Sequence, residues 1–302
     1  MSSSPGPAAA LLRLAPLLVG RARRGVVGRS RYARTLREAL RQAAHDPDRR
    51  AVLISGEPGL EKDNLAALIH FSSPDRRQLM VRLDGALLRE DGVELFGHEG
   101  ADAEPPLLDL LGAGALLIDK LDQVPPALQS RLLQLARTGQ WPDATAPSGW
   151  RPFPGRLFFT TEQPMPAFDR SCTLIRVPPL RVRRQDLGEW LRFGVRLRSR
   201  KLGWPQPPAV PEAVVKRLQS YDFPNNLREL ESLIYRALQQ VRRQELLQAT
   251  APEAGELPWP AVIPEDVFWT PPRQQRYRFD LWRWKPRLRD WMRAPLLWNA
   301  LL

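Results

Sequence analysis

Residues 51–71, AVLISGEPGLEKDNLAALIHF, decide the fold of this chain of 302 residues. The stretch begins with a short apolar run at 51–55 that is flanked by polar residues, which predicts a buried strand. A glycine-bearing loop follows at 56–62, and residues 65–71 then have the apolar pattern of a helix. A strand, a glycine-bearing loop and a helix in this order form the front half of a phosphate-binding unit.

Similar elements extend on both sides of this stretch. Residues 30–44 have helical spacing of their apolar positions, with Ser30 as a candidate N-cap, and residues 126–138 have the pattern of an amphipathic helix. Further buried strands are expected at residues 79–83, 114–119, 156–161 and 173–177. Strands that alternate with helices predict a parallel α/β sheet covered on both faces.

After the two prolines at 178–179 the pattern becomes entirely helical. The candidate helices lie at residues 185–202, 210–220 and 226–247. A small helical lid domain after the α/β domain is the natural interpretation.

The formal net charge of +12 is concentrated at the two ends of the chain. Residues 1–37 hold eight arginines and no acid, and residues 270–302 hold eight basic residues against two aspartates. The middle, residues 38–269, carries 29 basic and 31 acidic residues, a net charge of −2. A basic end can bind nucleic acid or an anionic membrane surface. The alternative is a compositional preference, because the chain uses 40 arginines against five lysines.

Cysteine and histidine usage excludes several classes of site. The single cysteine, Cys172, allows no internal disulfide and no cysteine metal cluster, and the three histidines show no metal-ligand spacing. A reducing, cytoplasmic-type interior is therefore expected. The sequence contains no run of 18 or more apolar residues, so no transmembrane helix is expected. In residues 1–25 the basic residues follow the apolar stretch, the wrong order for a secretory signal, so we expect a flexible or amphipathic extension there.

Six blocks of sequence, in chain order, resemble one family. They are GEPGLEKD at 56–63, ELFGHE at 94–99, GALLIDK at 114–120, VPPALQSRLL at 124–133, PPLRVRRQDL at 178–187 and YDFPNNLRELE at 221–231. Together they resemble the AAA+ ATPase domain of bacterial sigma-54-dependent transcription activators, over residues 26–240. The resemblance implies an α/β fold, an AAA+ P-loop NTPase core with a parallel sheet followed by a small helical lid domain.

The resemblance also implies a domain organisation. We expect a basic and apolar extension at 1–25, the AAA+ nucleotide-binding domain at 26–180, the helical lid domain at 181–249, a proline-rich linker at 250–272 and a basic, tryptophan-rich tail at 273–302.

By the same resemblance the implied ligands are ATP and Mg²⁺. The nucleotide-binding positions would be Gly56, Glu57, Gly59, Lys62, Asp63, Asp119 and Arg228, with Asp119 as the Mg²⁺ ligand. Glu162 stands at the end of the sensor strand, where the family has an asparagine, and Arg170 is the candidate arginine finger. The alternatives are a decayed loop that binds no nucleotide and, for Arg228, a surface salt bridge to Glu231.

Two residues differ from the family's motifs, and the charges that they introduce are opposite in sign. Glu61 replaces the glycine before the lysine, which adds a Cβ and a carboxylate where backbone must approach phosphate. Lys120 replaces the glutamate that orients the attacking water, a task an ammonium group cannot perform. No catalytic residue is therefore assigned with confidence, and hydrolysis is expected to be weak or absent. We hypothesise that Glu61 and Lys120 form an ion pair, which can include Asp63 or Asp119, on the assumption that the strands before the two loops are neighbours. The alternative is that the two substitutions arose independently of one another.

The partner surfaces also depart from the family. After His98 and Glu99 the family has a GAFTGA loop that grips the sigma factor, whereas residues 100–106 read GADAEPP, so the usual remodelling of the sigma factor is not expected. An RNA polymerase sigma factor or another regulatory protein, and a homo-oligomeric ring, remain the implied partners. No helix-turn-helix unit is evident after residue 250, so DNA binding is not supported.

The tail alternates Trp282, Trp284, Trp291 and Trp298 with basic residues, which favours an anionic membrane surface as a partner of residues 273–302, against docking on the domain itself. The expected location is cytoplasmic or peripheral to the inner face of a membrane. The sequence thus predicts an ATP-binding AAA+ regulatory protein with impaired hydrolysis. The alternatives are a non-hydrolysing pseudo-ATPase scaffold anchored through its tail, and an active ATPase that uses other residues.

Overall fold

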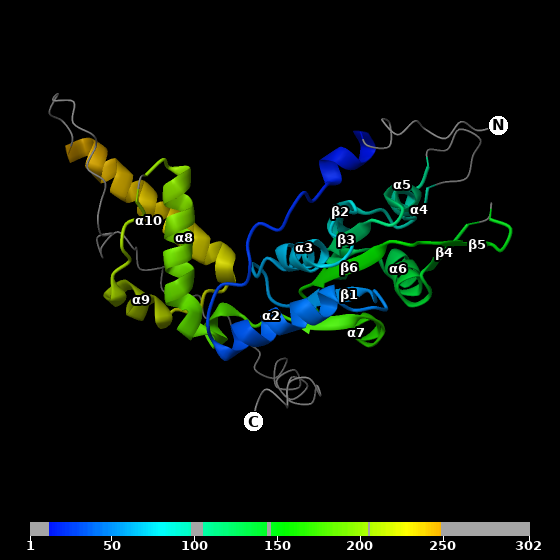
Figure 1. Cartoon of the computed structure of the whole chain (residues 1–302), viewed down its shortest axis with the longest axis horizontal. Coiled ribbons are helices and arrows are strands. Elements are labelled where there is room, and N and C mark those ends of the chain that lie inside the picture. The colour runs from blue at the N-terminus through cyan, green and yellow to red at the C-terminus, as the bar shows by residue number, and fades with distance from the viewer. Residues whose placement is uncertain (1–11, 98–104, 144–145, 205, 249–302) are drawn as a thin grey trace. The chain divides into compact units, whose positions relative to one another are not determined.

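The computed structural model of the chain describes residues 12–97, 105–143, 146–204 and 206–248 (Figure 1). The predictions made for residues 100–104 of the sigma-contact loop, for the linker at 250–272 and for the tail at 273–302 lie outside the described residues. The chain divides into two compact units, the first made of Met1–Gly25 and Leu36–Val177 and the second of Val26–Thr35 and Pro178–Leu302. Within the described ranges, no helix is both long enough and apolar enough to span a bilayer.

The first unit is built on a five-stranded parallel sheet with the strand order β2-β3-β6-β1-β7 (Figure 1). Its strands are β1 (Val52–Ser55), β2 (Met80–Asp84), β3 (Ala115–Asp119), β6 (Arg156–Thr161) and β7 (Thr173–Arg176). The predicted α/β class and parallel sheet are therefore confirmed. A two-stranded antiparallel ribbon, β4 (Gln140–Pro142) and β5 (Trp150–Pro152), lies apart from this sheet.

Helices cover both faces of the sheet, as the strand pattern requires. They are α2 (Arg31–Ala44), α3 (Lys62–Ser72), α4 (Val93–Phe96), α5 (Leu107–Leu111), α6 (Pro126–Thr138) and α7 (Pro166–Ser171), with short 3-10 turns η1 (Ala15–Leu17), η2 (Gly85–Leu87) and η3 (Leu121–Gln123). Leu116 and Phe159 belong to the core that α6 and α7 complete. Phe158, one residue earlier in β6, lies beside Arg156, whose Nη2 donates to Ala43 O of α2 at 2.7 Å. The alternation along the strand thus supplies apolar side chains to two layers of helices.

Residues 12–25 pack on the first unit instead of extending from it. Leu14 is 1% exposed and belongs to the core of the sheet, and Leu17 packs against the same core. Leu18 forms an antiparallel bridge with Val81, and Val19 N donates to Met80 O at 2.8 Å. The flexible alternative of the prediction is therefore wrong for these residues, whereas the amphipathic alternative fits a segment in which Leu14 is buried and Leu12 is exposed. The physical reason is that β2 is an edge strand, and this segment covers backbone groups that would otherwise be unpaired.

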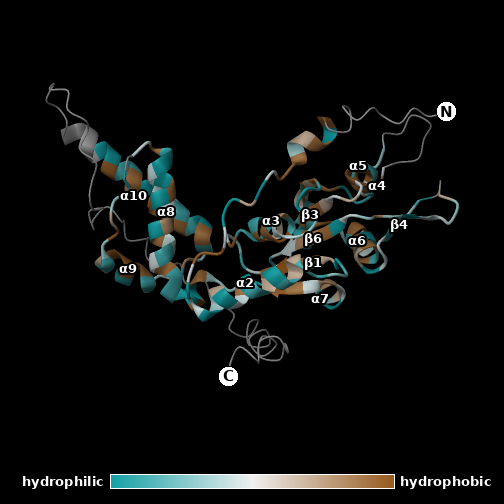
Figure 2. Cartoon of the chain, viewed as in Figure 1, coloured by the Kyte–Doolittle hydropathy of each residue, from teal (hydrophilic) through white to brown (hydrophobic). Residues whose placement is uncertain are grey.

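The second unit is helical. Its elements are η4 (Leu180–Val182), η5 (Arg184–Asp186), α8 (Leu187–Lys201), α9 (Glu212–Gln219) and α10 (Asn226–Gln248). The helices are amphipathic (Figure 2), and their apolar faces form a core of their own that includes Leu191, Val214 and Leu238, each fully buried. Helical structure was predicted for all three segments, and the bounds differ from the prediction by two residues or fewer.

The turn before α2 belongs to the second unit and is held by one carboxylate. Asp186, 1% exposed, accepts hydrogen bonds from Arg29 N at 2.8 Å, from Ser30 N at 2.7 Å and from the Ser30 hydroxyl. Gly28 has φ +119° and approaches this carboxylate so closely that a Cβ would lie 2.3 Å from its carbon. Ser30 also caps α2, because Ala33 N donates to its Oγ at 3.1 Å. The predicted N-cap is thus confirmed.

Candidate functional site

The predicted phosphate loop connects the carboxyl end of β1 to the first turn of α3. Lys62, the first residue of α3, is 7% exposed, and its Nζ donates to Gly56 O at 3.0 Å and to Glu57 O at 2.9 Å. Nζ also lies 3.5 Å from Glu162 Oε1. Burial lowers the pKa of Lys62, and the carboxylates of Glu162 and Asp119 act against that shift. The structure therefore brings the predicted loop lysine and the predicted sensor residue together.

Glu61 stands at the N-cap of α3 in the left-handed region, with φ 53° and ψ 48°. This is a conformation that glycine adopts freely and that costs other residues roughly 1–2 kcal/mol. The chain therefore retains the backbone bend of a glycine at this position although the side chain is a glutamate. Its Oε2 accepts a hydrogen bond from Arg24 Nε at 2.8 Å, so the carboxylate is neutralised from the N-terminal segment.

The hypothesis of an ion pair between Glu61 and Lys120 is wrong. Lys120 Nζ lies 2.7 Å from Asp84 Oδ2, whereas Glu61 pairs with Arg24. The reason is that each side chain has another partner: β6 separates β1 from β3, Lys120 pairs with the carboxylate that ends the adjacent strand β2, and Glu61 pairs with an arginine of the N-terminal segment. Partial burial acts to raise the pKa of Asp84, but the hydrogen bonds from Lys120 and from Ala86 N–H outweigh it and lower that pKa.

Asp119, the predicted Mg²⁺ ligand, ends β3 and uses both carboxylate oxygens within the protein. Its Oδ1 accepts from the Thr160 hydroxyl, and its Oδ2 accepts from Arg82 Nη2. Arg82 Nη1 also lies 3.3 Å from Asp63 Oδ2, so one guanidinium bridges the two aspartates of the predicted site. Asp63 further accepts from Arg23 Nη2 at 2.9 Å.

The donor set does not fit a magnesium ion. Mg²⁺ requires free oxygen ligands in octahedral geometry, and a guanidinium already engages the oxygen that the ion would use. Among the residues the structure describes, no group of three or more His, Cys, Asp or Glu side chains is arranged to hold a metal. The guanidinium of Arg82 therefore lies against the Asp119 carboxylate, where the prediction placed Mg²⁺.

Five carboxylates and five cations form what we call the paired-charge network. Its members are Glu61, Asp63, Asp84, Asp119 and Glu162 with Arg23, Arg24, Lys62, Arg82 and Lys120. The network carries no net formal charge, so its carboxylates do not depend on a metal ion for neutralisation.

Sequence reasoning missed Arg23, Arg24, Arg82 and Asp84 as members of this site. Arg82 did carry a signal, because it is the only charged residue within the apolar strand predicted at 79–83. The arginines of residues 21–24 carried none, since their proximity to the loop depends on how the N-terminal segment packs.

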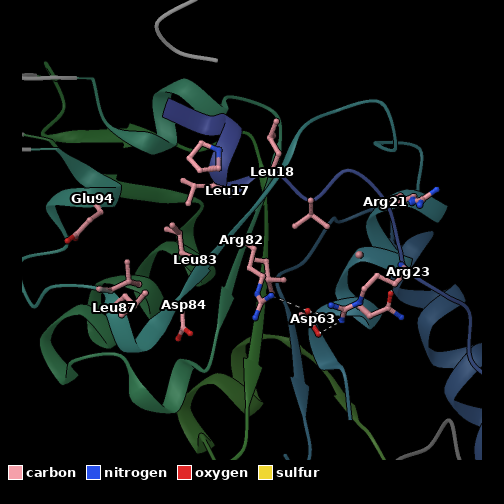
Figure 3. A pocket seen from close by; sticks show the side chains of 16 residues that line it. Leu17, Leu18, Arg21, Arg23, Asp63, Arg82, Leu83, Asp84, Leu87 and Glu94 are labelled. Atoms are coloured by element: carbon pink, nitrogen blue, oxygen red, sulfur yellow. Dashed lines mark hydrogen bonds and ion pairs between the residues drawn. The ribbon is translucent and has the colours of Figure 1, made fainter. Parts of the chain in front are cut away.

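A cavity of about 690 Å³ adjoins the network, between the N-terminal segment, β2 and α3 (Figure 3). Its lining combines leucines, among them Leu17, Leu83 and Leu87, with the charged side chains of Arg82 and Asp63. Figure 3 shows Arg82 and Asp63 directed toward one another at this cavity. The side chain of Arg82 is 40% exposed and therefore remains accessible to a ligand.

Four further predicted positions are not members of this network. Glu57 contributes its carbonyl oxygen to Lys62, and Gly59 takes φ +74° in the loop. Arg170 is exposed on α7. Arg228 is exposed in the first turn of α10, within the second unit. Their roles as arginine finger and lid-domain contact stay predictions.

Comparison with known proteins shows which proteins this chain resembles. Residues 26–144 match the family described as Sigma-54 interaction domain. These residues are therefore similar to a sigma-54 interaction domain. The chain is 28% identical over 232 residues to the Nif-specific regulatory protein of Azotobacter vinelandii, covering 70% of this chain and 44% of that protein. It is 30% identical over 233 residues to the DNA-binding transcriptional regulator NtrC of a Bradyrhizobium strain, covering 70% of this chain and 47% of that protein.

These relationships are distant and partial. The chain spans 70% of the Psp operon transcriptional activator of Escherichia coli at 28% identity, but less than half of the two relatives above. Among solved structures, NtrX from Brucella abortus in complex with ADP has a TM-score of 0.63 at 22% identity, covering 80% of this chain and 54% of NtrX. The ATP complex of the same protein has a TM-score of 0.63 at 20% identity, covering 87% of this chain and 61% of NtrX. The likeness of this chain to NtrX is therefore a likeness of fold.

Proposed function

We propose that this chain is an AAA+ regulatory protein of the sigma-54-activator type that binds ATP weakly and hydrolyses it slowly. The observation that carries the proposal is the pairing of Lys120 with Asp84 at 2.7 Å, in the position after Asp119 where the family has its water-orienting glutamate. An ammonium group held by a carboxylate can neither accept a proton nor orient water for attack.

Nucleotide binding is supported by the loop that joins β1 to α3. Gly59 keeps its positive φ, and the N-terminus of α3 retains the backbone N–H groups and helix dipole that favour a phosphate group. Lys62 remains in place, although its ammonium is bonded to the loop's own carbonyls and lies near Glu162. A phosphate group must therefore compete with these contacts, which is why we propose weak binding.

The proposed partners follow from the relatives. Proteins related to this chain include transcriptional regulators and activators, so we propose an RNA polymerase sigma factor, or another regulatory protein, as the partner, with self-association into a ring and a location where transcription takes place. DNA binding is not proposed, because no helix-turn-helix unit was recognised in the sequence.

The experiment compares ATP binding with phosphate release in the full chain. We expect measurable ATP binding, and a turnover lowered by about 10²–10⁴-fold, the range that a missing general base predicts. Lys62→Ala should abolish the binding, and Lys216→Ala, which removes an exposed lysine from α9, is the matched control. Rapid phosphate release by the wild-type chain, lost in Lys62→Ala, would contradict the proposal and favour an active ATPase.

A non-hydrolysing scaffold is the second candidate, and the paired-charge network is the observation that favours it. Every carboxylate and cation of the network already has a partner within the protein, so the loop holds its shape without a ligand. Complete absence of ATP binding by the full chain, with the fold intact by circular dichroism, selects the scaffold over the first candidate. A membrane role through residues 273–302 is tested separately by co-sedimentation with anionic vesicles, with and without those residues.

A further inference from the structure

The guanidinium of Arg82 lies where the two aspartates of the phosphate-loop site converge. Its Nη1 is 3.3 Å from Asp63 Oδ2, and its Nη2 donates to Asp119 Oδ2. The two aspartates come from different elements, the first turn of α3 and the end of β3, so Arg82 is the group that joins them. Figure 3 shows the arginine side chain reaching from β2 toward α3 along the wall of the cavity.

The position of Arg82 is well determined by its surroundings. It lies in the middle of β2 in register with Leu117 of β3, so its backbone is fixed by the parallel ladder. Asp119 is oriented by the Thr160 hydroxyl on its other oxygen, and Asp63 is held in addition by Arg23. Burial acts to lower the pKa of Arg82, but the nearby carboxylates of Asp119 and Asp63 outweigh it and raise that pKa. The cation is therefore permanent at every pH the protein meets.

A divalent cation in such a site neutralises carboxylates and attracts the phosphate groups of the nucleotide. A guanidinium can do the same, since it binds a carboxylate and a phosphate group with separate N–H donors of one planar fork. Arg82 is half-exposed toward the cavity, and Lys62, Arg23 and Arg24 are further cations of the same network. The site thus holds its own cations and offers no free carboxylate to a metal.

We propose that Arg82 is a built-in cation that takes the place of magnesium, so that this chain binds a nucleoside di- or triphosphate without needing a metal ion. The inference rests on the proposed function, because it concerns the form of nucleotide that the same site accepts. It also distinguishes the site from that of a metal-dependent ATPase, since chelation of Mg²⁺ leaves the affinity for nucleotide unchanged.

The first experiment needs only the wild-type chain. Binding of a fluorescent ATP analogue is titrated in excess Mg²⁺ and again in excess EDTA, at one ionic strength. The expected dissociation constants agree within about twofold, whereas a site that depends on the metal would lose at least about tenfold in EDTA. A loss of that size in the wild-type chain overturns the inference and leaves nucleotide binding itself intact.

The second experiment asks whether Arg82 is the cause. In Arg82→Gln the Asp119 carboxylate loses its arginine partner, while Asp63 keeps Arg23, so affinity should fall at least about tenfold in EDTA and recover when Mg²⁺ is added. Arg82→Lys keeps the charge and should stay independent of Mg²⁺. Arg89→Gln, which removes an exposed arginine paired with Glu94, is the control and should behave as the wild type. Equal behaviour of Arg82→Gln and the wild type in both buffers contradicts the inference.

A readout without nucleotide separates the two proposals. Binding of Mn²⁺ to the nucleotide-free chain, followed by electron paramagnetic resonance, is expected for Arg82→Gln and not for the wild type. If neither buffer supports ATP binding by the wild type, the proposed function fails. The Mn²⁺ result still tests the built-in cation: equal Mn²⁺ binding by the two chains would overturn it, and binding by the variant alone would support it.

Discussion

Strands β3 and β6 are neighbours in the sheet, but a residue of β6 belongs to the apolar core and a residue of β3 belongs to the paired-charge network. Phe159 of β6 is fully buried between the sheet and α7, where its ring packs edge to face against Phe168. Asp119 ends β3 and is held by two directed contacts, from Thr160 and from Arg82. The apolar core is non-directional, and its strength follows the area removed from water. The paired-charge network depends on individual partners, so its members can be exchanged while the fold persists.

This comparison teaches why a phosphate-loop site can change its charges without loss of the sheet. The core between the strands and helices needs only apolar residues of suitable volume at alternating positions. At the carboxyl ends of the strands, each charged side chain requires a counter-ion. The counter-ions of Glu61 and Lys120 come from separate segments of the chain.

The largest expected effect lies in the core. Phe159→Ala should lower the free energy of unfolding by about 3–5 kcal/mol, because it removes a buried aromatic ring and leaves a cavity. Urea unfolding followed by tryptophan fluorescence measures the change. Leu87→Ala, at a leucine that is 80% exposed, is the control and should change stability by less than about 0.5 kcal/mol. A loss below about 1 kcal/mol for Phe159→Ala would show that this core is not the stabilising region.

Removal of a buried carboxylate should lower the free energy of unfolding nearly as much as removal of a core side chain. Asp186→Ala removes the acceptor for two backbone N–H groups and a hydroxyl, and should lower stability by about 2–4 kcal/mol. Thermal unfolding by circular dichroism measures it. Asp222→Ala is the control, because Asp222 is exposed and pairs only on the surface with Arg184, a contact worth about 0–1 kcal/mol. Equal losses in the two variants would break the distinction between buried and exposed charges.

Acidification should weaken the fold through His70. This side chain is 1% exposed, burial lowers its pKa from 6.5, and its Nε2 lies 3.0 Å from Gln78 O. Below pH 6.5 the unfolded chain takes up a proton that the folded chain resists, so stability is lost as the pH falls from 6.5 toward the lowered pKa. Urea midpoints measured between about pH 7.5 and about pH 5, the range in which histidine changes charge, give the dependence of stability on pH. His70→Gln should flatten it relative to His45→Gln, and an unchanged slope would exclude His70 as its source.

The smallest effect is expected within the paired-charge network. Lys120→Ala removes a pair whose side chains are 37% and 29% exposed, and should change stability by only about 0–1 kcal/mol. The same urea measurement applies, with Lys201→Ala at an exposed position of α8 as the control. A loss as large as that of Phe159→Ala would show that the network supports the fold and not only the site.

The sequence predicted the elements well where local pattern decides them. The helix at 126–138 and the strand at 156–161 have the predicted bounds, because amphipathic spacing and an uninterrupted apolar run are local features. The strand order was not predicted: β6 lies between β1 and β3, and the supposed Glu61–Lys120 pair is replaced by pairs with Arg24 and with Asp84. Strand order depends on contacts between distant segments, which periodicity does not encode.

The site was predicted only in part. The positions of Lys62, Asp63 and Asp119 follow from motif spacing, and the structure places them at one edge of the sheet. The bridge from Arg82 was missed, although an arginine inside an apolar strand was visible in the sequence. The contribution of Arg24 could not be found, because 37 residues separate it from Glu61 and no local pattern links them.

The discontinuity of the second unit has a consequence for how the chain is made. Ser30 leaves the ribosome 156 residues before Asp186, the carboxylate that holds its backbone. During synthesis the turn at Gly28 must therefore wait, with its N–H groups bonded to water, until the helical segment has emerged. A gene fragment that starts at residue 178 would encode the three long helices of this unit without the turn that Asp186 binds, leaving that buried acid without its donors.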